Sequence, residues 1–307
     1  MSRRPLVAAV VLALVLVAWL GARAEAPTPA APPAAPAKET AGMAPAEAGT
    51  QPNQFFDAAY FYPGLDEARQ APAPRGEGRL VGGLTSHHGV AGGVIAQLFL
   101  EVGERPPATV ILVGPNHANR GQQAITGRRS WATDFGPVET DQALVDRLVA
   151  AGLATVDEET LSPEHAMGAL MPYVKYVAPH AKVVPLILSR SMSLADVRAL
   201  AQFLAPLTGP DRPLIASVDF SHYLTAAEAE EKDEVTLAAI QQRDLDALWR
   251  MGPEYLDSPQ SLGLLLLTMQ TVGASGPEIA AHTNSGRLLR NPALACTSYF
   301  TFKYRDR

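Results

Sequence analysis

Residues 109–117 read Thr-Val-Ile-Leu-Val-Gly-Pro-Asn-His, and this stretch decides the fold. Its first five residues are apolar or β-branched, which is typical of a strand that is buried on both faces of a sheet. A Gly-Pro turn ends the strand and is followed by two polar residues, Asn116 and His117. The stretch therefore predicts a central strand of an α/β protein, with a polar site at its carboxyl end.

Short apolar or β-branched runs alternate with longer helical patterns from about Phe55 to the end of the chain. We therefore predict an α/β fold with three layers, α/β/α, around a largely parallel central sheet. One expected helix has Ser162 as its N-cap and Pro163 in its first turn. The expected strands are 80–84, 109–113, 182–188, 214–218 and 297–304, and the expected helices are 141–151, 163–177, 194–204, 226–243 and 261–272.

Histidines follow the expected strands or open a helix in four polar clusters. These are His87-His88, Asn116-His117, Glu164-His165, and Asp219-Phe220-Ser221-His222-Tyr223. Because ligand sites in open α/β sheets lie beyond the carboxyl ends of the strands, we expect five of the seven histidines to gather at one edge. A lone histidine at a strand end is usually a satisfied hydrogen-bonding residue. Several from separate strands indicate a metal site, because neutral imidazole binds Fe, Zn or Cu, commonly together with a carboxylate.

These motifs, in this order, resemble the Memo family, which is also known as AmmeMemoRadiSam system protein B. The matching elements are Phe61-Tyr62-Pro63, Ser86-His87-His88-Gly89, Gly114-Pro115-Asn116-His117, the pattern of Trp131, Thr133 and Gly136, Glu164-His165, and the stretch from Ser217 to Tyr223. The resemblance covers nearly all of the chain from about Phe55 onward. It implies one domain similar to extradiol ring-cleavage dioxygenases of the protocatechuate type, in which two histidines and a carboxylate hold Fe(II).

The resemblance implies His87 and His117 as metal ligands, with Fe(II) as the first expectation and Cu or Zn as alternatives. His88 stands where the family has Ala, so it is a further candidate beside His87. The family commonly supplies a cysteine as the third ligand, but aligning the helix that follows on residues 263–266 places Asp257 at that position. We therefore expect two histidines and one carboxylate. The alternative is that Asp257 only begins the turn before the helix.

The first functional hypothesis is metal-dependent redox chemistry, in which His222 or His165 acts as general acid or base near a bound substrate and Asp219 orients the imidazole. The alternative function is a non-catalytic module that holds metal, a small molecule or a peptide in a vestigial active-site cleft. One departure favours that alternative, since Ala166-Met167-Gly168 replaces the family's polar and acidic residues after the Glu-His pair. A hydrolase built on Ser221 has less support, because the chain has no Gly-x-Ser-x-Gly elbow.

Residues 1–24 have the pattern of an export signal. Arg3 and Arg4 precede an apolar run that extends to about Ala22, and Ala22-Arg23-Ala24 has the small-x-small pattern of a cleavage site. An uncleaved membrane anchor is the alternative. Residues 25–51 are rich in Ala and Pro and predict a flexible linker, so the folded domain is expected at 52–307. In both cases the domain is expected to be exported, either periplasmic or extracellular, with a membrane tether if the signal is retained.

The charge of the chain limits the classes of partner that we expect, and its cysteine content limits disulfide formation. The 25 Lys and Arg against 31 Asp and Glu give a net charge of −6, and no basic run is present, so a nucleic acid is not expected. A small molecule or a peptide in the cleft is the expected ligand. The single cysteine, Cys296, excludes an intrachain disulfide and lies in an apolar run that is typical of a buried strand.

Overall fold

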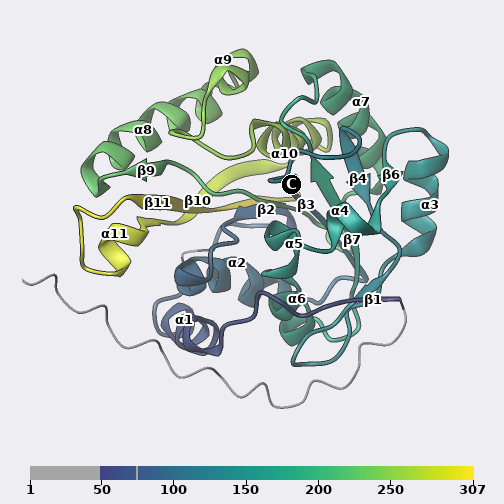
Figure 1. Cartoon of the computed structure of the whole chain (residues 1–307), viewed down its shortest axis with the longest axis horizontal. Coiled ribbons are helices and arrows are strands. Elements are labelled where there is room, and N and C mark those ends of the chain that lie inside the picture. Colours follow the sequence, from purple (N-terminus) through teal and green to yellow (C-terminus); the bar gives the residue numbers. More distant parts are fainter. Residues whose placement is uncertain (1–48, 74) are drawn as a thin grey trace, which may run out of the picture. The chain divides into compact units, whose positions relative to one another are not determined.

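The computed structural model describes residues 49–73 and 75–307. The expected export signal and nearly all of the expected linker lie outside these residues. A nine-stranded sheet forms the central layer, with the strand order β10-β11-β2-β8-β3-β7-β4-β6 and with β9 paired to β11 (Figure 1). The strands of this sheet are β2 (Leu80–Thr85), β3 (Thr109–Pro115), β4 (Ala124–Thr126), β6 (Thr155–Val156), β7 (Lys182–Leu188), β8 (Leu214–Ser217), β9 (His222–Leu224), β10 (Ser275–Asn284) and β11 (Cys296–Arg305).

The centre of the sheet is parallel and its flanks are mixed. Strands β2, β8, β3 and β7 pair in parallel, as expected for strands joined by helical crossovers. By contrast, β11 is antiparallel to both β2 and β10, and β4 is antiparallel to β7. The predicted α/β fold with three layers is therefore confirmed, and its parallel character belongs to the four central strands.

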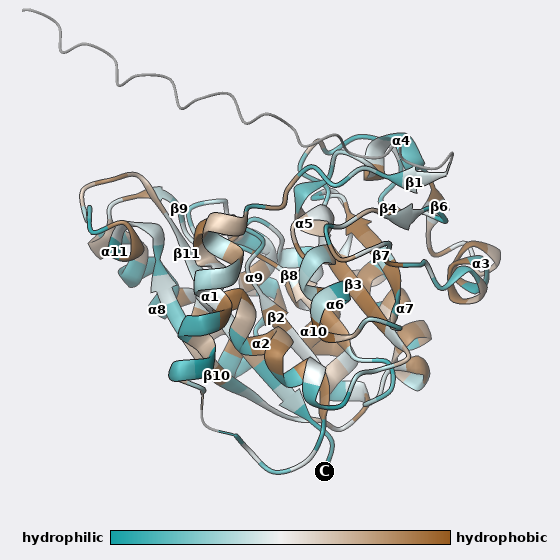
Figure 2. Ribbon diagram, turned by 90° about the horizontal axis from the view of Figure 1, so that it is seen from below, coloured by the Kyte–Doolittle hydropathy of each residue, from teal (hydrophilic) through white to brown (hydrophobic). Residues whose placement is uncertain are grey.

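Strand β3 is buried on both faces, as its sequence predicts. Val110 and Leu112 pack into the core formed with α1, α2 and α6, whereas Ile111 and Val113 pack into the opposite core with α3, α7 and α10. Figure 2 shows the hydrophobic residues of β3 and β7 at the centre of the sheet. The first set of helices is α1 (Ala58–Gln70), α2 (Gly92–Glu104) and α6 (Met171–Val177), and the second is α3 (Gln142–Ala150), α7 (Leu194–Leu204) and α10 (Pro259–Thr271).

The helix expected at 163–177 is divided in two. It consists of α5 (His165–Gly168) and α6. The expected N-cap is also wrong, because Ser162 is the C-cap of α4 (Glu158–Leu161), while the Glu164 side chain caps α5 by accepting from the Ala166 N–H. The remaining helices are α8 (Ala226–Gln242), α9 (Leu245–Arg250) and α11 (Ser285–Leu288). Within the described ranges, no helix combines the length and the apolar character that a membrane crossing requires.

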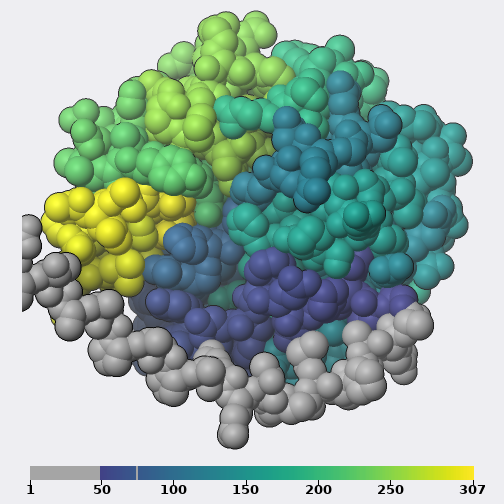
Figure 3. All heavy atoms as spheres, in the orientation of Figure 1, coloured from purple at the N-terminus to yellow at the C-terminus, as the bar shows by residue number. Residues whose placement is uncertain are grey.

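The start of the described chain is held against the middle of the domain. Thr50 and Gln51, at the end of the stretch expected to be a linker, form β1 (Thr50–Gln51), which pairs in parallel with β5 (Ser130–Trp131). The Gln51 side chain is buried and donates to Glu158 Oε2 at 2.6 Å. Figure 3 shows this N-terminal segment, in purple, on the surface against teal atoms from the middle of the chain.

Cys296 begins β11 and is 1% exposed, packed with Ala226 and Ala229 of α8. Burial raises the pKa of its thiol. A buried thiol of this kind behaves as a small apolar residue, in agreement with the expectation that Cys296 packs in the core.

The backbones of helices α1 and α2 lie very close together at two glycines, Gly64 and Gly92. A Cβ atom added at Gly64 would collide with the backbone of Gly92 and Gly93, and one added at Gly92 would collide with the backbone of Tyr60. Since backbone atoms cannot rotate away as a side chain can, this close approach requires the absence of a side chain at both positions.

We predict that Gly64→Ala destabilises the domain by about 2 kcal/mol, because the two helix backbones must separate. This cost exceeds the gain of about 1 kcal/mol that alanine brings to a helix. Gly209→Ala is the matched control, since a Cβ there meets nothing within 4 Å. Thermal unfolding of both variants measures the difference, and an equal melting temperature would contradict the predicted collision.

Candidate metal centre

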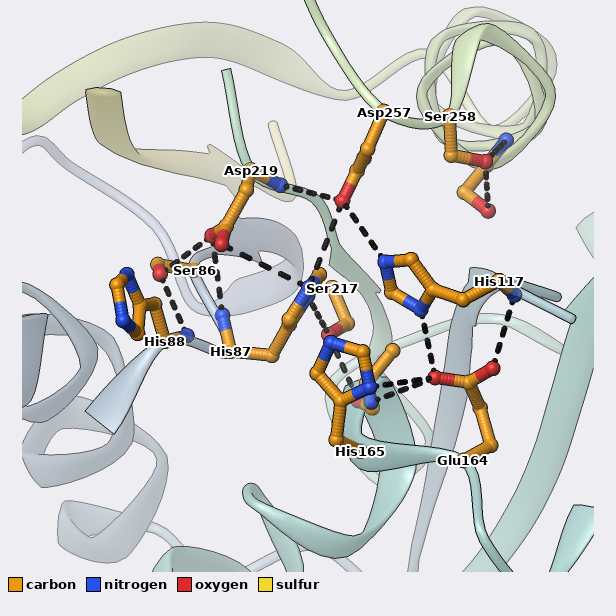
Figure 4. Close-up of polar contacts among 12 residues, drawn as sticks. Ser86, His87, His88, His117, Glu164, His165, Ser217, Asp219, Asp257 and Ser258 are labelled. Carbon is orange, nitrogen blue, oxygen red and sulfur yellow. Dashed lines mark hydrogen bonds and ion pairs between the residues drawn. The ribbon is translucent and has the colours of Figure 1, made fainter. Parts of the chain in front are cut away.

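Three of the predicted site histidines meet at the carboxyl ends of the central strands. His87 follows β2, His117 follows β3 and His165 begins α5, and their rings face one another (Figure 4). The ring centroid of His87 lies 5.2 Å from that of His117 and 5.1 Å from that of His165, while the rings of His117 and His165 stack at 4.1 Å. These three histidines therefore meet at one edge of the sheet, as predicted.

His87 presents its Nε2 atom to the centre. Its Nδ1 lies 3.0 Å from Ser217 Oγ, and that hydroxyl donates to the Ala166 carbonyl at 2.7 Å. Because the hydroxyl hydrogen is already used, Ser217 Oγ accepts from the Nδ1–H of His87. The Nε2 atom of this buried ring then carries the free lone pair that a metal ion requires.

His117 is oriented in the same way by a carboxylate. Its Nδ1 lies 2.7 Å from Glu164 Oε1, and its backbone N–H donates to Glu164 Oε2 at 2.9 Å. Burial acts to raise the pKa of Glu164, but the bonds to His117 outweigh it and lower the pKa, so the carboxylate stays ionised. A carboxylate behind a histidine fixes its tautomer and strengthens it as a metal ligand.

Asp257 supplies an oxygen between these two nitrogens. Its Oδ2 lies 3.5 Å from His87 Nε2 and 3.7 Å from His117 Nε2. Two ligands that each lie about 2.1 Å from one ion are roughly 3.0–3.4 Å apart, so each of these two oxygen–nitrogen distances is a few tenths of an ångström longer than in a bound site. Ser258, and not Asp257, caps α10, which leaves the Asp257 carboxylate available to the centre.

His165 offers a second donor set that shares two members with the first. One ring nitrogen from each of His87, His117 and His165 lies within 4.8 Å of the others, so these three could also hold a metal ion. Burial together with the neighbouring His87 and His117 lowers the pKa of His165 to about 4. Its ring is therefore neutral at neutral pH and can bind a cation or a substrate.

Asp219 lies beside the centre, with its Oδ2 atom 3.6 Å from His87 Nε2, whereas His88 points to another group. Asp219 Oδ1 accepts from Ser86 Oγ at 2.5 Å and from the His87 backbone N–H at 3.3 Å, so this carboxylate orients the turn that carries His87. Burial acts to raise its pKa, but the neighbouring histidines and Ser86 outweigh it and lower the pKa. His88 turns to Tyr299, whose hydroxyl lies 2.6 Å from its Nδ1, so His87 is the member of the pair that faces the centre.

His222 lies at the rim of the centre. Its backbone N–H donates to the Pro253 carbonyl, and its Nδ1 atom is buried with no hydrogen-bond partner in the described part of the chain. Asp219 makes no hydrogen bond to His222 or His165 within that part. Asp219 instead contacts His87, through its backbone N–H and through the ring Nε2 at 3.6 Å.

Sequence reasoning did not single out two residues that build the site. Ser217 appeared only within a motif, although it orients His87, and Arg190 was not considered. Arg190 follows β7 at the same edge of the sheet, and its guanidinium donates to the backbone carbonyls of Asp257 at 3.1 Å and Met251 at 2.9 Å. The position directly after a central strand is the signal that could have indicated Arg190.

Comparisons with known proteins identify relatives of this chain and a solved structure with the same fold. A family model described as Memo-like protein matches residues 65–301. A MEMO1 family protein of Pyrobaculum aerophilum is 27% identical over 229 residues, covering 69% of this chain and 79% of the relative. One from Methanosarcina acetivorans is 27% identical over 219 residues, covering 68% and 80%. An uncharacterized protein of Escherichia coli K12 shares the fold, with a TM-score of 0.50 and 16% identity, over 73% of this chain and 99% of that one.

Metal binding at this centre should depend on pH through His117. Burial acts to lower the pKa of His117, but the carboxylates of Asp257 and Glu164 outweigh it and raise the pKa to about 10. A metal ion must displace that proton, so its affinity falls as pH falls. We predict that the affinity of the metal-free protein for Zn²⁺ rises about tenfold per pH unit between about pH 7 and about pH 8.5, measured by competition with a chromogenic chelator.

Glu164→Gln is the informative variant for this prediction. It removes one of the two carboxylates that raise the pKa of His117, so the dependence of affinity on pH should become weaker. An affinity for Zn²⁺ that does not change with pH in the unsubstituted protein would show that no proton is displaced from His117.

Proposed function

Since the chain belongs to the Memo family, whose model matches residues 65–301, we propose that it is an exported, metal-dependent redox enzyme. In this proposal His87, His117 and Asp257 hold Fe(II). The observation that carries the proposal is the position of Asp257 Oδ2, at 3.5 Å from one histidine Nε2 and 3.7 Å from the other. Two imidazoles and one carboxylate on one side of a cation leave its other positions open.

The donor set supports a divalent transition metal. Each histidine is held by a partner on Nδ1, Ser217 for His87 and Glu164 for His117, so both Nε2 atoms are available as ligands. Imidazole and carboxylate donors together suit Fe(II), and Cu and Zn bind the same atoms. Fe(II) bound here would supply one-electron redox chemistry and open coordination positions. Zn²⁺ has no redox chemistry, so activity distinguishes the two.

The other site residues are given roles in proton transfer to substrate or in positioning the metal ligands. His222 has a buried, unpartnered Nδ1 among the described residues, and we assign it the transfer of a proton to or from substrate. His165 is the second candidate for this role, because its low pKa keeps it neutral. Asp219 positions His87 through the Ser86 turn. The export of the enzyme, and a membrane tether if residues 1–24 are retained, rest on the N-terminal sequence pattern.

The protein purified without chelator should contain about one metal ion per chain by elemental analysis. Asp257→Ala should remove most of this metal, because it deletes the carboxylate oxygen that lies within 3.7 Å of both Nε2 atoms. Asp246→Ala, at an exposed position, is the matched control and should keep it. His165→Gln should also keep the metal. Loss of metal in His165→Gln together with retention in Asp257→Ala would assign the centre to three histidines and contradict the proposal.

Turnover should separate an enzyme from a binding module. The Fe(II)-loaded protein is expected to consume oxygen with at least one compound from a panel of catechols, aliphatic hydroxy acids and amines. With that compound, His222→Gln should lower the rate by about 10²-fold or more while the metal content stays unchanged. Metal without oxygen consumption on the whole panel would instead favour the non-catalytic module.

A further inference from the structure

A pocket of about 230 Å³ adjoins the proposed metal ligands and contains polar groups that those ligands do not use. His117 and Asp257 form one part of its lining, and Asn116, Arg190, His222 and Gln260 contribute further polar groups. These four residues come from separate segments, which follow β3 and β7, begin β9 and open α10. The pocket is therefore built by the same edge of the sheet as the metal centre.

Two amide oxygens in this lining lack a hydrogen-bond donor. Asn116 Oδ1 and Gln260 Oε1 are buried and have no partner among the described residues. Their orientation is determined by their nitrogens, since Asn116 Nδ2 donates to the Arg120 carbonyl at 2.6 Å and Gln260 Nε2 to the Arg190 carbonyl at 2.9 Å. An unsatisfied buried acceptor is destabilising, so a ligand that brings O–H or N–H groups is favoured here.

Arg190 sets the sign of the ligand's charge. Its guanidinium donates to two backbone carbonyls, and no salt bridge joins it to a carboxylate within residues 49–73 and 75–307. The Asp257 carboxylate also lines the pocket, but it faces His87 and His117, so the Arg190 guanidinium keeps only backbone carbonyls as its hydrogen-bond partners. An anionic group on the ligand is attracted to it, whereas an ammonium group is repelled.

We propose that this pocket binds a small hydroxy acid, with the carboxylate at Arg190 and hydroxyl groups donating to Asn116 Oδ1 and Gln260 Oε1. This inference rests on the proposed function, because it names the class of substrate that the metal centre would oxidise. The volume of about 230 Å³ has room for a compound of about six carbons. His222, whose Nδ1 is unpartnered in the described chain, would then lie beside the hydroxyl-bearing carbons.

Calorimetric titration of the full protein, dialysed free of metal, tests the inference with three probes. Gluconate carries both features, sorbitol carries hydroxyl groups without charge, and hexanoate carries charge without hydroxyl groups. We expect gluconate to bind at least about tenfold more tightly than either of the others, since each of the others lacks one of the two kinds of contact. Equal binding of gluconate and sorbitol, or of gluconate and hexanoate, would overturn the inference.

Substitutions test which residue produces the preference for gluconate over sorbitol and which produces the preference for gluconate over hexanoate. Arg190→Gln should abolish the preference for gluconate over sorbitol, and Arg190→Lys should retain it. Gln260→Leu should reduce the preference for gluconate over hexanoate. Arg198→Gln, on the exposed face of α7, is the matched control. A preference ratio is not moved by a general loss of stability, so unchanged ratios in Arg190→Gln and Gln260→Leu would overturn the assignment even if both variants are less stable.

The two proposals fail separately in this experiment because the titration is done without metal. A protein that retains metal through Asp257 but does not distinguish gluconate from sorbitol and hexanoate would overturn the hydroxy-acid inference alone. A protein that distinguishes these probes but never retains metal would overturn the proposed redox function, and the pocket would remain a hydroxy-acid site without an oxidising centre.

Discussion

The hydrogen bonds to the Nδ1 atoms of His87 and His117 determine what this site can do. Ser217 accepts one and Glu164 accepts the other, so Nε2 is the atom of each ring that binds a metal once the ring is neutral. Without these partners the rings could rotate, or adopt the other tautomer, and the centre would lose its two nitrogen ligands. Glu164 also caps α5, so the element that carries His165 is positioned by the same carboxylate.

The sheet supplies the rigidity that this arrangement needs. The parallel strands β2, β8, β3 and β7 are packed by helices on both faces, so the loops at their carboxyl ends start from fixed positions. The segment that ends at Asp257 is tied to these loops by reciprocal contacts, in which Asp257 N–H donates to the Asp219 carbonyl and Asp219 N–H donates to Asp257 Oδ2. Arg190 holds the same segment from β7. The Asp257 carboxylate, on the loop between α9 and α10, is thus held beside the histidines that follow the central strands.

The central sheet and the edge where the histidines meet could be predicted from sequence. Strands that are buried on both faces have a clear apolar pattern, and β3 and β7 match it. The helix at 163–177 was not predicted correctly, since helical propensity does not reveal that Glu164 turns its side chain back onto α5. Strand β10 was not expected either, because SGPEIAAHTN has no apolar alternation and is stabilised by pairing with β11. Asp257 was found by family resemblance, whereas its distance from the two histidines depends on tertiary contacts.

The most direct test of the centre is a crystal structure of the Fe(II)-loaded protein, prepared without oxygen, with the ion located by its anomalous scattering at the iron edge. An ion about 2.0–2.2 Å from His87 Nε2, His117 Nε2 and Asp257 Oδ2 is the predicted result. An ion bound by His165 in place of Asp257, or an iron-soaked crystal with no anomalous signal between His87 and His117, would contradict a centre of two histidines and one carboxylate.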